Sequence, residues 1–251
     1  MKKSVGIIGA NGYTGSELVR LLAFHPNVEI KLLYSRSKAG VKISDLYADL
    51  EAVCDLVLTN EISQVDILFL CLPHKESRNW LNDNSVSDET LIIDLGNDFR
   101  LETEFKNRNF IYGLPEIYFN EIKESKSIAN PGCFATAIQL ALLPLAKGNL
   151  LKEVNTTGIT GSTGAGQSLQ ATTHFTWRND NISAYKTLNH QHVDEILKQI
   201  NSLNNQEVEL NFVPWRGDFA RGIFTSSIIG CDWELEEIYS LYKDFYKDSP
   251  F

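Results

Sequence analysis

One cysteine of the chain lies where a helix is expected to begin. Cys133 follows an Asn130-Pro131-Gly132 turn and precedes an apolar run that predicts a helix over residues 134–147. Because a helix N-terminus favours negative charge, a thiol placed there ionises more readily than an ordinary thiol, whose pKa is about 8.5. The position therefore predicts a nucleophile. The alternative is an inert residue, since buried cysteine is a common small hydrophobe.

The other three cysteines show no such context. Cys54, Cys71 and Cys231 are widely spaced, and the chain has no C-x-x-C pair, so the spacing fits neither a disulfide framework nor a zinc ribbon. Cys71 lies within an apolar run, and Cys231 ends a predicted apolar strand. We expect all three to be inert small hydrophobic residues.

A thiolate that forms a thioester needs an acid/base group for the proton of the tetrahedral oxygen, and histidine is the usual choice. His190 and His192 precede a predicted helix over residues 193–201. An H-x-H pair can share a metal ion only if it is extended, and no acidic or thiol ligand set accompanies this one. We predict no metal and a general base in this loop, with His190 ahead of His192. Of the remaining histidines, His25 precedes Pro26 at a predicted helix end, His74 follows Pro73 at the end of the sheet, and His174 lies in a Thr/Trp-rich stretch.

A glycine-rich turn of spacing G-x-x-G-x-x-G follows the first predicted strand and opens a helix. The first glycine permits the tight turn, the second lets backbone amides approach a pyrophosphate, and the third lets helix and strand pack closely. This context predicts a dinucleotide-binding turn, with a purely structural turn as the alternative. The cofactor-binding residues predicted here are Gly9, Asn11, Gly12, Tyr13, Thr14 and Gly15.

The end of the second predicted strand indicates which dinucleotide is bound. Ser35, Arg36 and Ser37 stand where a ribose-binding carboxylate would mark NAD. Hydroxyl groups and a guanidinium suit a 2′-phosphate instead. We therefore predict NADP, with a solvated loop arginine as the alternative for Arg36.

Two sequence patterns divide the chain. Short apolar runs at residues 5–8, 28–34, 66–72 and 91–94 alternate with helical spacing, as at 14–24, which is typical of a parallel sheet with crossover helices. Later come two helices, glycine-rich loops and two long strands near 207–213 and 222–230. We predict an α/β protein with a Rossmann-type parallel-sheet nucleotide domain at residues 1–132. A mixed α+β catalytic and dimerisation domain is predicted at residues 133–251.

Composition limits the partners. The 251 residues include 23 Lys plus Arg and 32 Asp plus Glu, for a net charge of −9, so there is no overall basic field for nucleic acid. No apolar stretch reaches the roughly 18 residues that a membrane span requires. The first residues lead directly into a strand without a cleavage site. We expect a cytoplasmic protein that binds neither nucleic acid nor membrane.

Together these motifs resemble the N-acetyl-γ-glutamyl-phosphate reductase family of arginine biosynthesis, which is related to aspartate-semialdehyde dehydrogenase. The matches run in the family's order from residue 6 to about residue 224. The segments similar to family motifs are residues 9–15 (G-A-x-G-Y-x-G), 72–74 (L-P-H), 93–101 (I-D-L-S-A-D-F-R-L), 112–116 (Y-G-L-P-E), 129–136 (A-N-P-G-C-Y-P-T), 161–166 (G-x-S-G-A-G) and 184–196 (A-Y…H-R-H-x-x-E-I).

The resemblance implies NADPH-dependent reduction of an N-acyl-γ-glutamyl phosphate through a thioester on Cys133, with release of phosphate. It implies His190 as the acid/base group, although the gap from Tyr185 is one residue shorter than the family spacing, which keeps His192 as an alternative. It also implies a homo-oligomer, and backbone amides of residues 162–166 as an anion-binding nest. The further cofactor-binding residues implied are Pro73, His74, Ser162, Gly164 and Ala165. The implied substrate-binding residues are Arg100, Asn130, Tyr185, Arg216 and Arg221, and Arg178 is a further candidate for an anion.

Two departures from the family pattern bear on substrate and activity. Residues 214–223 differ from the family's P-H-x-x-P-M-x-R-G-I in bulk and charge, and the added Arg216 suits an N-acyl group that ends in a carboxylate, such as N-succinyl. The sequence stops at Phe251, whereas the family continues, so we expect that a C-terminal segment is missing. The alternatives to the implied function are aspartate-semialdehyde dehydrogenase and a nonenzymatic NADP-binding regulator.

Overall fold

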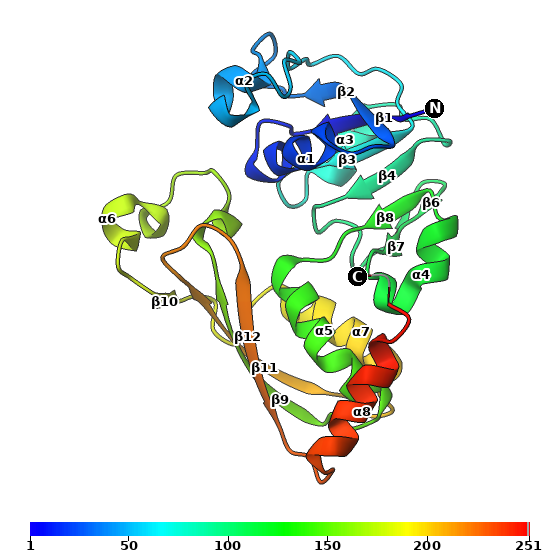
Figure 1. Cartoon of the computed structure of the whole chain (residues 1–251), viewed down its shortest axis with the longest axis vertical. Helices are drawn as coiled ribbons and strands as arrows, with labels where there is room; N and C mark the ends of the chain where they lie inside the picture. Colours follow the sequence, from blue (N-terminus) through cyan, green and yellow to red (C-terminus); the bar gives the residue numbers. More distant parts are fainter. Residues whose placement is uncertain (250) are drawn as a thin grey trace. The chain divides into compact units, whose positions relative to one another are not determined.

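The computed structural model describes residues 1–249 and 251. The chain forms two compact units (Figure 1). The first consists of Met1–Leu114 and Tyr118–Pro131, and the second of Pro115–Ile117 and Gly132–Phe251.

The first unit contains a six-stranded parallel sheet with the strand order β2-β1-β3-β4-β8-β7. Strand β1 pairs with β2 on one side and with β3 on the other, so the strand order reverses there, and the carboxyl ends of β1 and β3 form the crevice at which such sheets bind nucleotides. This confirms the predicted Rossmann-type sheet. The strands are β1 (Lys3–Ile8), β2 (Val28–Tyr34), β3 (Ile67–Leu70), β4 (Leu91–Asp94), β7 (Ile111–Tyr112) and β8 (Ser127–Ala129).

Both faces of this sheet are covered. The neighbouring residues Ile7 and Ile8 of β1 belong to two different core clusters, because successive side chains of a strand point to opposite faces. Val19 of α1 packs in one cluster and Trp80 of α3 in the other. The helices and the small hairpin are α1 (Tyr13–Ala23), α2 (Ile43–Leu46), η1 (Ala48–Leu50), α3 (Ser77–Asp83), α4 (Pro115–Glu124), β5 (Glu104–Phe105) and β6 (Arg108–Asn109).

The second unit contains a four-stranded mixed sheet with the order β10-β11-β9-β12. Strands β9 and β11 are parallel, whereas β12 and β10 are antiparallel to their neighbours. This confirms the predicted mixed α+β architecture. The elements are α5 (Cys133–Lys147), β9 (Glu153–Thr160), η2 (Ser162–Ala165), η3 (Ala171–Thr173), α6 (Phe175–Arg178), β10 (Ser183–Ala184), α7 (His192–Leu203), β11 (Glu209–Arg216), β12 (Ile223–Ile229) and α8 (Leu235–Tyr246).

One face of the second sheet is covered by α5 and α7. Ile138 of α5, Ile196 of α7 and Phe212 of β11 are fully buried in the same core cluster. Helix α8 packs on the outside of α5, where the Tyr246 hydroxyl donates a hydrogen bond to the Leu140 carbonyl at 2.5 Å. The unit therefore places the first residues of α5 and α7 on a rigid layer.

Candidate active site

Cys133 is the first residue of α5, one residue earlier than the sequence predicts. Gly132 is the N-cap in extended geometry (φ −66°, ψ 151°), and its carbonyl accepts the first helical hydrogen bond, from Thr136 at 2.8 Å. The amides of the first helical turn have no acceptors within the helix, and the helix dipole adds positive potential at the same end. Cys133 itself is exposed. This position suits a nucleophilic thiolate.

The residue after the thiol is buried and fixed. Phe134 is 1% exposed, and its ring lies 5.0 Å from the Phe212 ring and 5.7 Å from the His190 ring, centroid to centroid. A Cβ atom on Gly158 would lie 2.6 Å from Cε1 of Phe134, so β9 accommodates this ring only because residue 158 is glycine. The thiol is therefore adjacent to a side chain that contacts the predicted acid/base group.

His190 lies in an aromatic cage. Its ring is 5.7 Å from Tyr185, 5.4 Å from Phe212 and 4.7 Å from His192, and the residue is 5% exposed. Nδ1 accepts the backbone N–H of His192 at 3.2 Å, so the neutral ring carries its proton on Nε2.

Burial is the main reason that the pKa of His190 falls to about 4. The positive potentials of His192 and Lys186 lower this pKa further, and Glu195 opposes them. The imidazole is therefore neutral at pH 7 and presents an N–H donor at Nε2.

Tyr185 and Arg216, both predicted to bind substrate, lie next to His190. The Arg216 guanidinium carbon is 4.6 Å from the centroid of the Tyr185 ring. Burial raises the pKa of the Tyr185 hydroxyl, Arg216 lowers it, and the thiol of Cys133 raises it. Cys133 directly precedes Phe134, whose ring contacts that of His190, so the thiol and this cluster belong to the same part of the second unit.

Sequence reasoning missed Glu195. The side chain is 3% exposed, and Oε1 accepts the backbone N–H of Gly132 at 2.8 Å. A signal was present, because Glu195 lies among the buried positions of α7 at helical spacing, between His192 and Gln199. An acid on the apolar face of a helix indicates a specific buried partner.

Three predicted anion-binding arginines differ in environment. Arg100 is 4% exposed, and its Nε donates to the Asn130 carbonyl at 2.9 Å. Arg178 is 5% exposed and donates to the carbonyls of Thr172 and Arg216, among others. These buried guanidinium groups support loops, so the prediction of Arg178 as an anion ligand is not supported. Arg221 is exposed.

The loop at 161–166 does not form the predicted nest. The Ser162 amide donates to the Phe219 carbonyl at 2.7 Å, its hydroxyl donates to the Gly217 carbonyl at 2.8 Å, and the Gly164 amide donates to the Gly161 carbonyl at 3.3 Å. These donors are already bound to protein oxygens, so they are not directed at an anion. The cofactor contacts of Ser162, Gly164 and Ala165 stay predictions.

The glycines of the first turn have different structural requirements. Gly9 has φ +80°, and a Cβ there would lie 2.3 Å from the Cys71 carbonyl oxygen, while a Cβ on Gly15 would lie 2.4 Å from the Gly9 oxygen. Gly12 has φ −80°, and its nearest neighbour would be that same oxygen at 3.4 Å. The fold thus needs glycine at 9 and 15 but not at 12, where the missing side chain leaves space at the N-terminus of α1. A bound pyrophosphate fits this space.

The predicted ribose-phosphate residues lie beside this turn. The amide of Gly9 donates to the carbonyl of Tyr34, the last residue of β2, at 3.0 Å. Ser35 is buried, whereas Arg36 and Ser37 are exposed. The geometry therefore fits a nucleotide that continues from the glycine turn toward the end of β2.

Other predicted cofactor-binding residues lie at the same ends of the strands. Pro73 and His74 follow the end of β3, and the Cys71 amide donates to Ile8 of β1 at 2.8 Å. The Asn11 carbonyl accepts the Tyr47 hydroxyl at 2.8 Å. These residues border the carboxyl ends of β1 and β3.

The remaining cysteines are not alike. Cys54 is 8% exposed, and burial raises the pKa of the Cys71 thiol well above its ordinary range. Cys231 is exposed beyond the end of β12, so its assignment as a small hydrophobic residue is wrong. It follows the strand instead of ending it.

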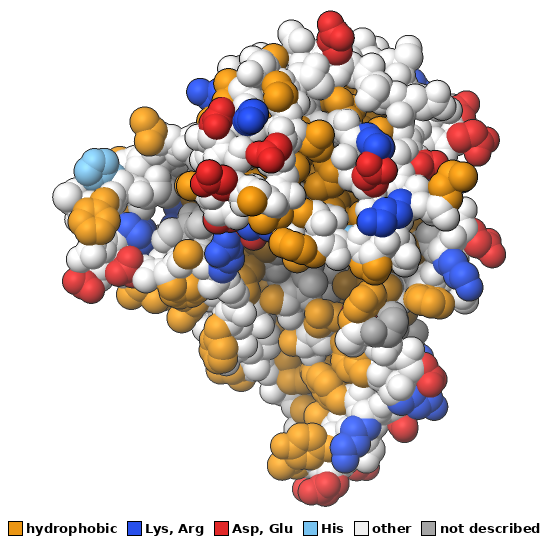
Figure 2. All heavy atoms as spheres, turned by 45° about the horizontal axis from the view of Figure 1, so that its top comes forward, with side chains coloured by type: hydrophobic (Ala, Val, Ile, Leu, Met, Phe, Trp, Pro, Cys, Tyr) orange, Lys and Arg blue, Asp and Glu red, His pale blue; other side chains and the backbone are white. Residues whose placement is uncertain are grey.

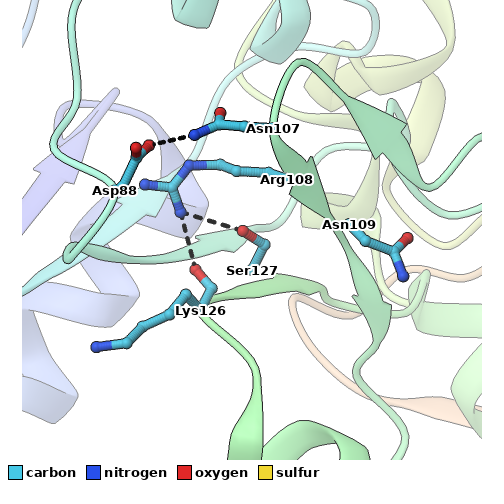
Figure 3. Close-up of a pocket in the computed structure, with 6 residues that line it drawn as sticks. All are labelled: Asp88, Asn107, Arg108, Asn109, Lys126 and Ser127. Atoms are coloured by element: carbon cyan, nitrogen blue, oxygen red, sulfur yellow. Dashed lines mark hydrogen bonds between the residues drawn. The ribbon is translucent and has the colours of Figure 1, made fainter.

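A polar pocket in the first unit, shown in Figure 3, lies at the opposite ends of the sheet's strands. Arg108 donates there to the carbonyls of Ser87, Thr90 and Lys126 and to the Ser127 hydroxyl. These residues precede or begin β4 and β8, so the pocket is at the amino ends of the strands, whereas parallel sheets bind nucleotides at the carboxyl ends. The guanidinium holds backbone together. The pocket is lined by Asp88, Asn107, Arg108, Asn109, Lys126 and Ser127.

Within residues 1–249 and 251, the structure contains no group of three or more His, Cys, Asp or Glu side chains arranged to hold a metal ion. No helix in the described part of the chain has the length and apolar character needed to cross a membrane.

Comparison with known proteins first defines the class. Residues 4–125 match the family described as "Semialdehyde dehydrogenase, NAD binding domain", and residues 133–251 match "Semialdehyde dehydrogenase, dimerisation domain". The fold is similar to aspartate semialdehyde dehydrogenase II of Vibrio cholerae (TM-score 0.70, 15% identity, 100% of this chain and 80% of that one). It is also similar to aspartate semialdehyde dehydrogenase with NADP from Candida albicans (TM-score 0.66, 17% identity, 96% and 76%). The chain is therefore a nicotinamide-dependent oxidoreductase of the semialdehyde dehydrogenase class.

More similar relatives define the family. The N-acetyl-gamma-glutamyl-phosphate reductase of Flavobacterium johnsoniae is 51% identical over 99% of this chain and 78% of its own length. Those of Phocaeicola vulgatus and Bacteroides fragilis are 48% and 47% identical, each over 98% of this chain and 77% of the relative. The chain belongs to the N-acetyl-gamma-glutamyl-phosphate reductase family, which confirms the resemblance seen in the sequence.

Proposed function

We propose that this chain reduces an N-acyl-γ-glutamyl phosphate to the corresponding semialdehyde, with release of phosphate, in arginine biosynthesis. One observation carries the proposal: the thiol at the first residue of α5 is followed directly by Phe134, whose ring contacts His190, a neutral imidazole whose Nδ1 is fixed by a backbone amide. Residues 1–132 would bind the nucleotide, and residues 133–251 would form the catalytic domain.

Cys133 begins the reaction as a thiolate, stabilised by the first turn of α5. Its sulfur bonds to the acyl carbon, the carbon–oxygen bond to phosphate breaks, and phosphate leaves with that electron pair, which yields a thioester. When bound, NADPH supplies the hydride that reduces the thioester carbon. His190 Nε2–H donates to the tetrahedral oxygen as negative charge develops on it. The carbon–sulfur bond then breaks, which releases the aldehyde and restores the thiolate of Cys133.

The preference for NADP is supported by the side chains at the end of β2. Arg36 and Ser37 are exposed there, next to a glycine turn with space for a pyrophosphate. An arginine attracts a 2′-phosphate, whereas the carboxylate typical of NAD sites repels it. Arg36→Ala is expected to raise the KM for NADPH roughly tenfold, the loss of about one charge-assisted hydrogen bond, and to leave the KM for NADH nearly unchanged.

The identity of the N-acyl group is a separate question. The relatives are named for N-acetyl substrates. Arg216 supports N-succinyl as a second candidate, because its Nε is buried without a hydrogen-bond partner in the described structure, and its guanidinium lies over Tyr185. Comparison of kcat/KM for the two acyl phosphates decides between them, and a large preference for N-acetyl removes the second candidate.

A homo-oligomer is supported by one face of the second sheet. Phe224 and Ile228, four residues apart and therefore on the same face of β12, are 67% and 72% exposed. Hydrophobic side chains gather on the surface over this part of the second unit (Figure 2). Phe224→Glu with Ile228→Glu should lower the mass measured by light scattering, whereas Phe175→Glu, an equally exposed aromatic of α6, should not. The cytoplasm stays the predicted location.

The function is tested in the oxidative direction with N-acetylglutamate semialdehyde, inorganic phosphate and NADP⁺. Wild type should form NADPH only when phosphate is present. Cys133→Ser should abolish the reaction, and His190→Asn should lower kcat by about 100-fold or more. Activity on aspartate semialdehyde in place of the N-acyl substrate would favour the aspartate enzyme. Nucleotide binding with background turnover would favour a nonenzymatic regulator.

A further inference from the structure

A buried carboxyl group joins the two helices that carry the reacting side chains. Glu195 lies in the first turn of α7, three residues after His192, and is 3% exposed. Its Oε1 accepts the N–H of Gly132 at 2.8 Å, although the two residues are 63 positions apart in the chain. Helices α5 and α7 lie side by side in Figure 1.

The amide that Glu195 binds lies at the start of α5. Gly132 is the N-cap of α5, so its N–H is one of the four that a helix leaves without an internal acceptor. The other three belong to Cys133, Phe134 and Ala135, at the place where the thiol and any oxyanion formed on it would lie. Glu195 therefore binds the first of these four donors from outside the helix.

A second bond fixes the same pair of helices. The backbone carbonyl of Glu195 accepts Nε2 of Gln139, which is fully buried on α5, at 3.2 Å. The side chain and the main chain of one residue thus hold the first two turns of α5. The first turn of α7, which contains Glu195, also orients the acid/base group, because the His192 amide in that turn donates to Nδ1 of His190.

We propose that Glu195 is a positioning residue that sets the register between Cys133 and His190 by accepting the Gly132 amide. The inference rests on the proposed function, since it assumes that Cys133 is the nucleophile. Glu195 acts through the backbone of α5 and not through contact with substrate. Displacement of a nucleophile by about 1 Å costs on the order of 100-fold in rate, so a single hydrogen bond at this place has a large effect on kcat.

The variants separate acceptor geometry from charge. Glu195→Gln keeps an oxygen acceptor of the same reach, whereas Glu195→Asp keeps the charge but is one methylene too short to reach Gly132. We expect Glu195→Gln to retain kcat within about tenfold of wild type. Glu195→Asp and Glu195→Ala should lose about 100-fold in kcat, with KM values for acyl phosphate and NADPH within about threefold of wild type.

A second readout isolates the step on the thiol. The burst of phosphate release without NADPH reports acylation of Cys133 alone, and it should slow in Glu195→Asp to the same degree as kcat. Asp194→Asn is the matched control, because it removes a charge from the same helical turn at an exposed position, and it should leave both rates within about twofold. If Glu195→Ala does not fold, the Gln and Asp variants decide alone.

Other outcomes overturn the proposal. Equal losses in Glu195→Gln and Glu195→Asp would assign the effect to the whole side chain and not to the acceptor, and a rise in substrate KM at constant kcat would make Glu195 a substrate ligand. Full activity of Glu195→Asp would also refute it. Failure of the proposed function looks different, because wild type would then show neither a phosphate burst nor phosphate-dependent turnover, and Cys133→Ser would equal wild type.

Discussion

The ring of Phe134 lies edge-on to the ring of His190, with centroids 5.7 Å apart and planes at 83°. This contact connects the residue after the candidate nucleophile to the candidate acid/base group. It exists because Gly158 on β9 has no side chain.

Gly158→Ala is therefore expected to disturb the candidate active site by displacing the ring of Phe134. The new methyl group would lie 2.6 Å from the Phe134 ring and must displace it, at a cost of about 1–3 kcal/mol in the free energy of unfolding. We expect kcat to fall by about tenfold or more, because the displacement reaches both Cys133 and His190. Gly230→Ala, where nothing lies within 4 Å, is the control. Unchanged urea unfolding and kcat in Gly158→Ala would contradict the packing argument.

The pKa of His190 predicts a dependence of stability on pH. Burial lowers this pKa from 6.5 to about 4, so the unfolded chain binds the proton more readily than the folded chain. The stabilising contribution is complete above pH 6.5 and is lost as pH falls toward 4, up to about 3 kcal/mol. The difference in unfolding free energy between wild type and His190→Asn should thus shrink across this range. A difference that stays constant between pH 6.5 and pH 4 would contradict the buried environment of His190.

The pH dependence of kcat/KM should also reflect the lowered pKa of His190. An imidazole with a pKa near 4 stays neutral down to about pH 5, so His190 should contribute no loss of kcat/KM between pH 8 and pH 5. An inflection near pH 6.5 that disappears in His190→Asn would contradict the buried environment.

The glycine turn predicts two separable defects. Gly12→Ala should fold with nearly wild-type stability, because its Cβ meets only one oxygen at 3.4 Å, but it should weaken NADPH binding by about tenfold or more. Gly15→Ala should instead destabilise the first unit, since its Cβ would lie 2.4 Å from the Gly9 oxygen. Thermal unfolding and fluorescence titration with NADPH distinguish the two. Equal NADPH affinity of Gly12→Ala and wild type would refute a pyrophosphate site at the N-terminus of α1.

Arg108 should matter for stability and not for chemistry. Arg108→Met leaves the carbonyls of Ser87 and Thr90 without this donor, which is expected to cost about 2–4 kcal/mol in unfolding free energy. In the folded enzyme kcat should be unchanged, because the pocket lies at the amino ends of the strands. Lys126→Met in the same pocket should cost less than about 1 kcal/mol, as its exposed ion pair with Glu89 is weak.

The sequence predicted the elements with strong periodicity. The strands at 28–34 and 91–94 and the helix that begins beside Cys133 were found where alternation and turn residues indicated them. The sequence predicts no strand at the position of β9, because the buried face of this strand consists largely of Thr156, Gly158 and Thr160 instead of large apolar residues. Such a strand is defined by its neighbours β11 and β12, which local pattern does not reveal.

The same limit applies to the site. Cys133 and His190 are predicted from residue type and position, and Tyr185 from the family resemblance, whereas the role of a buried charged side chain depends on which backbone atoms the fold brings to it. Arg178 supports the Arg216 carbonyl instead of an anion, and Glu195 meets Gly132 across the unit. Neither partner is close in sequence, so no spacing rule identifies it.

The short stretch from Asn130 to Gly132 is held at both ends, by Arg100 on the Asn130 carbonyl and by Glu195 on the Gly132 amide. Each of these two bonds lies within one unit, so Gly132 is fixed relative to α7 by the second bond alone. Insertion of one residue between Gly132 and Cys133 would break the bond to Glu195 or displace the sulfur from the start of α5, whereas the exposed turn near Asn205 has room for additional residues. Natural variants of this enzyme should thus gain residues in such exposed turns before they gain one between Gly132 and Cys133.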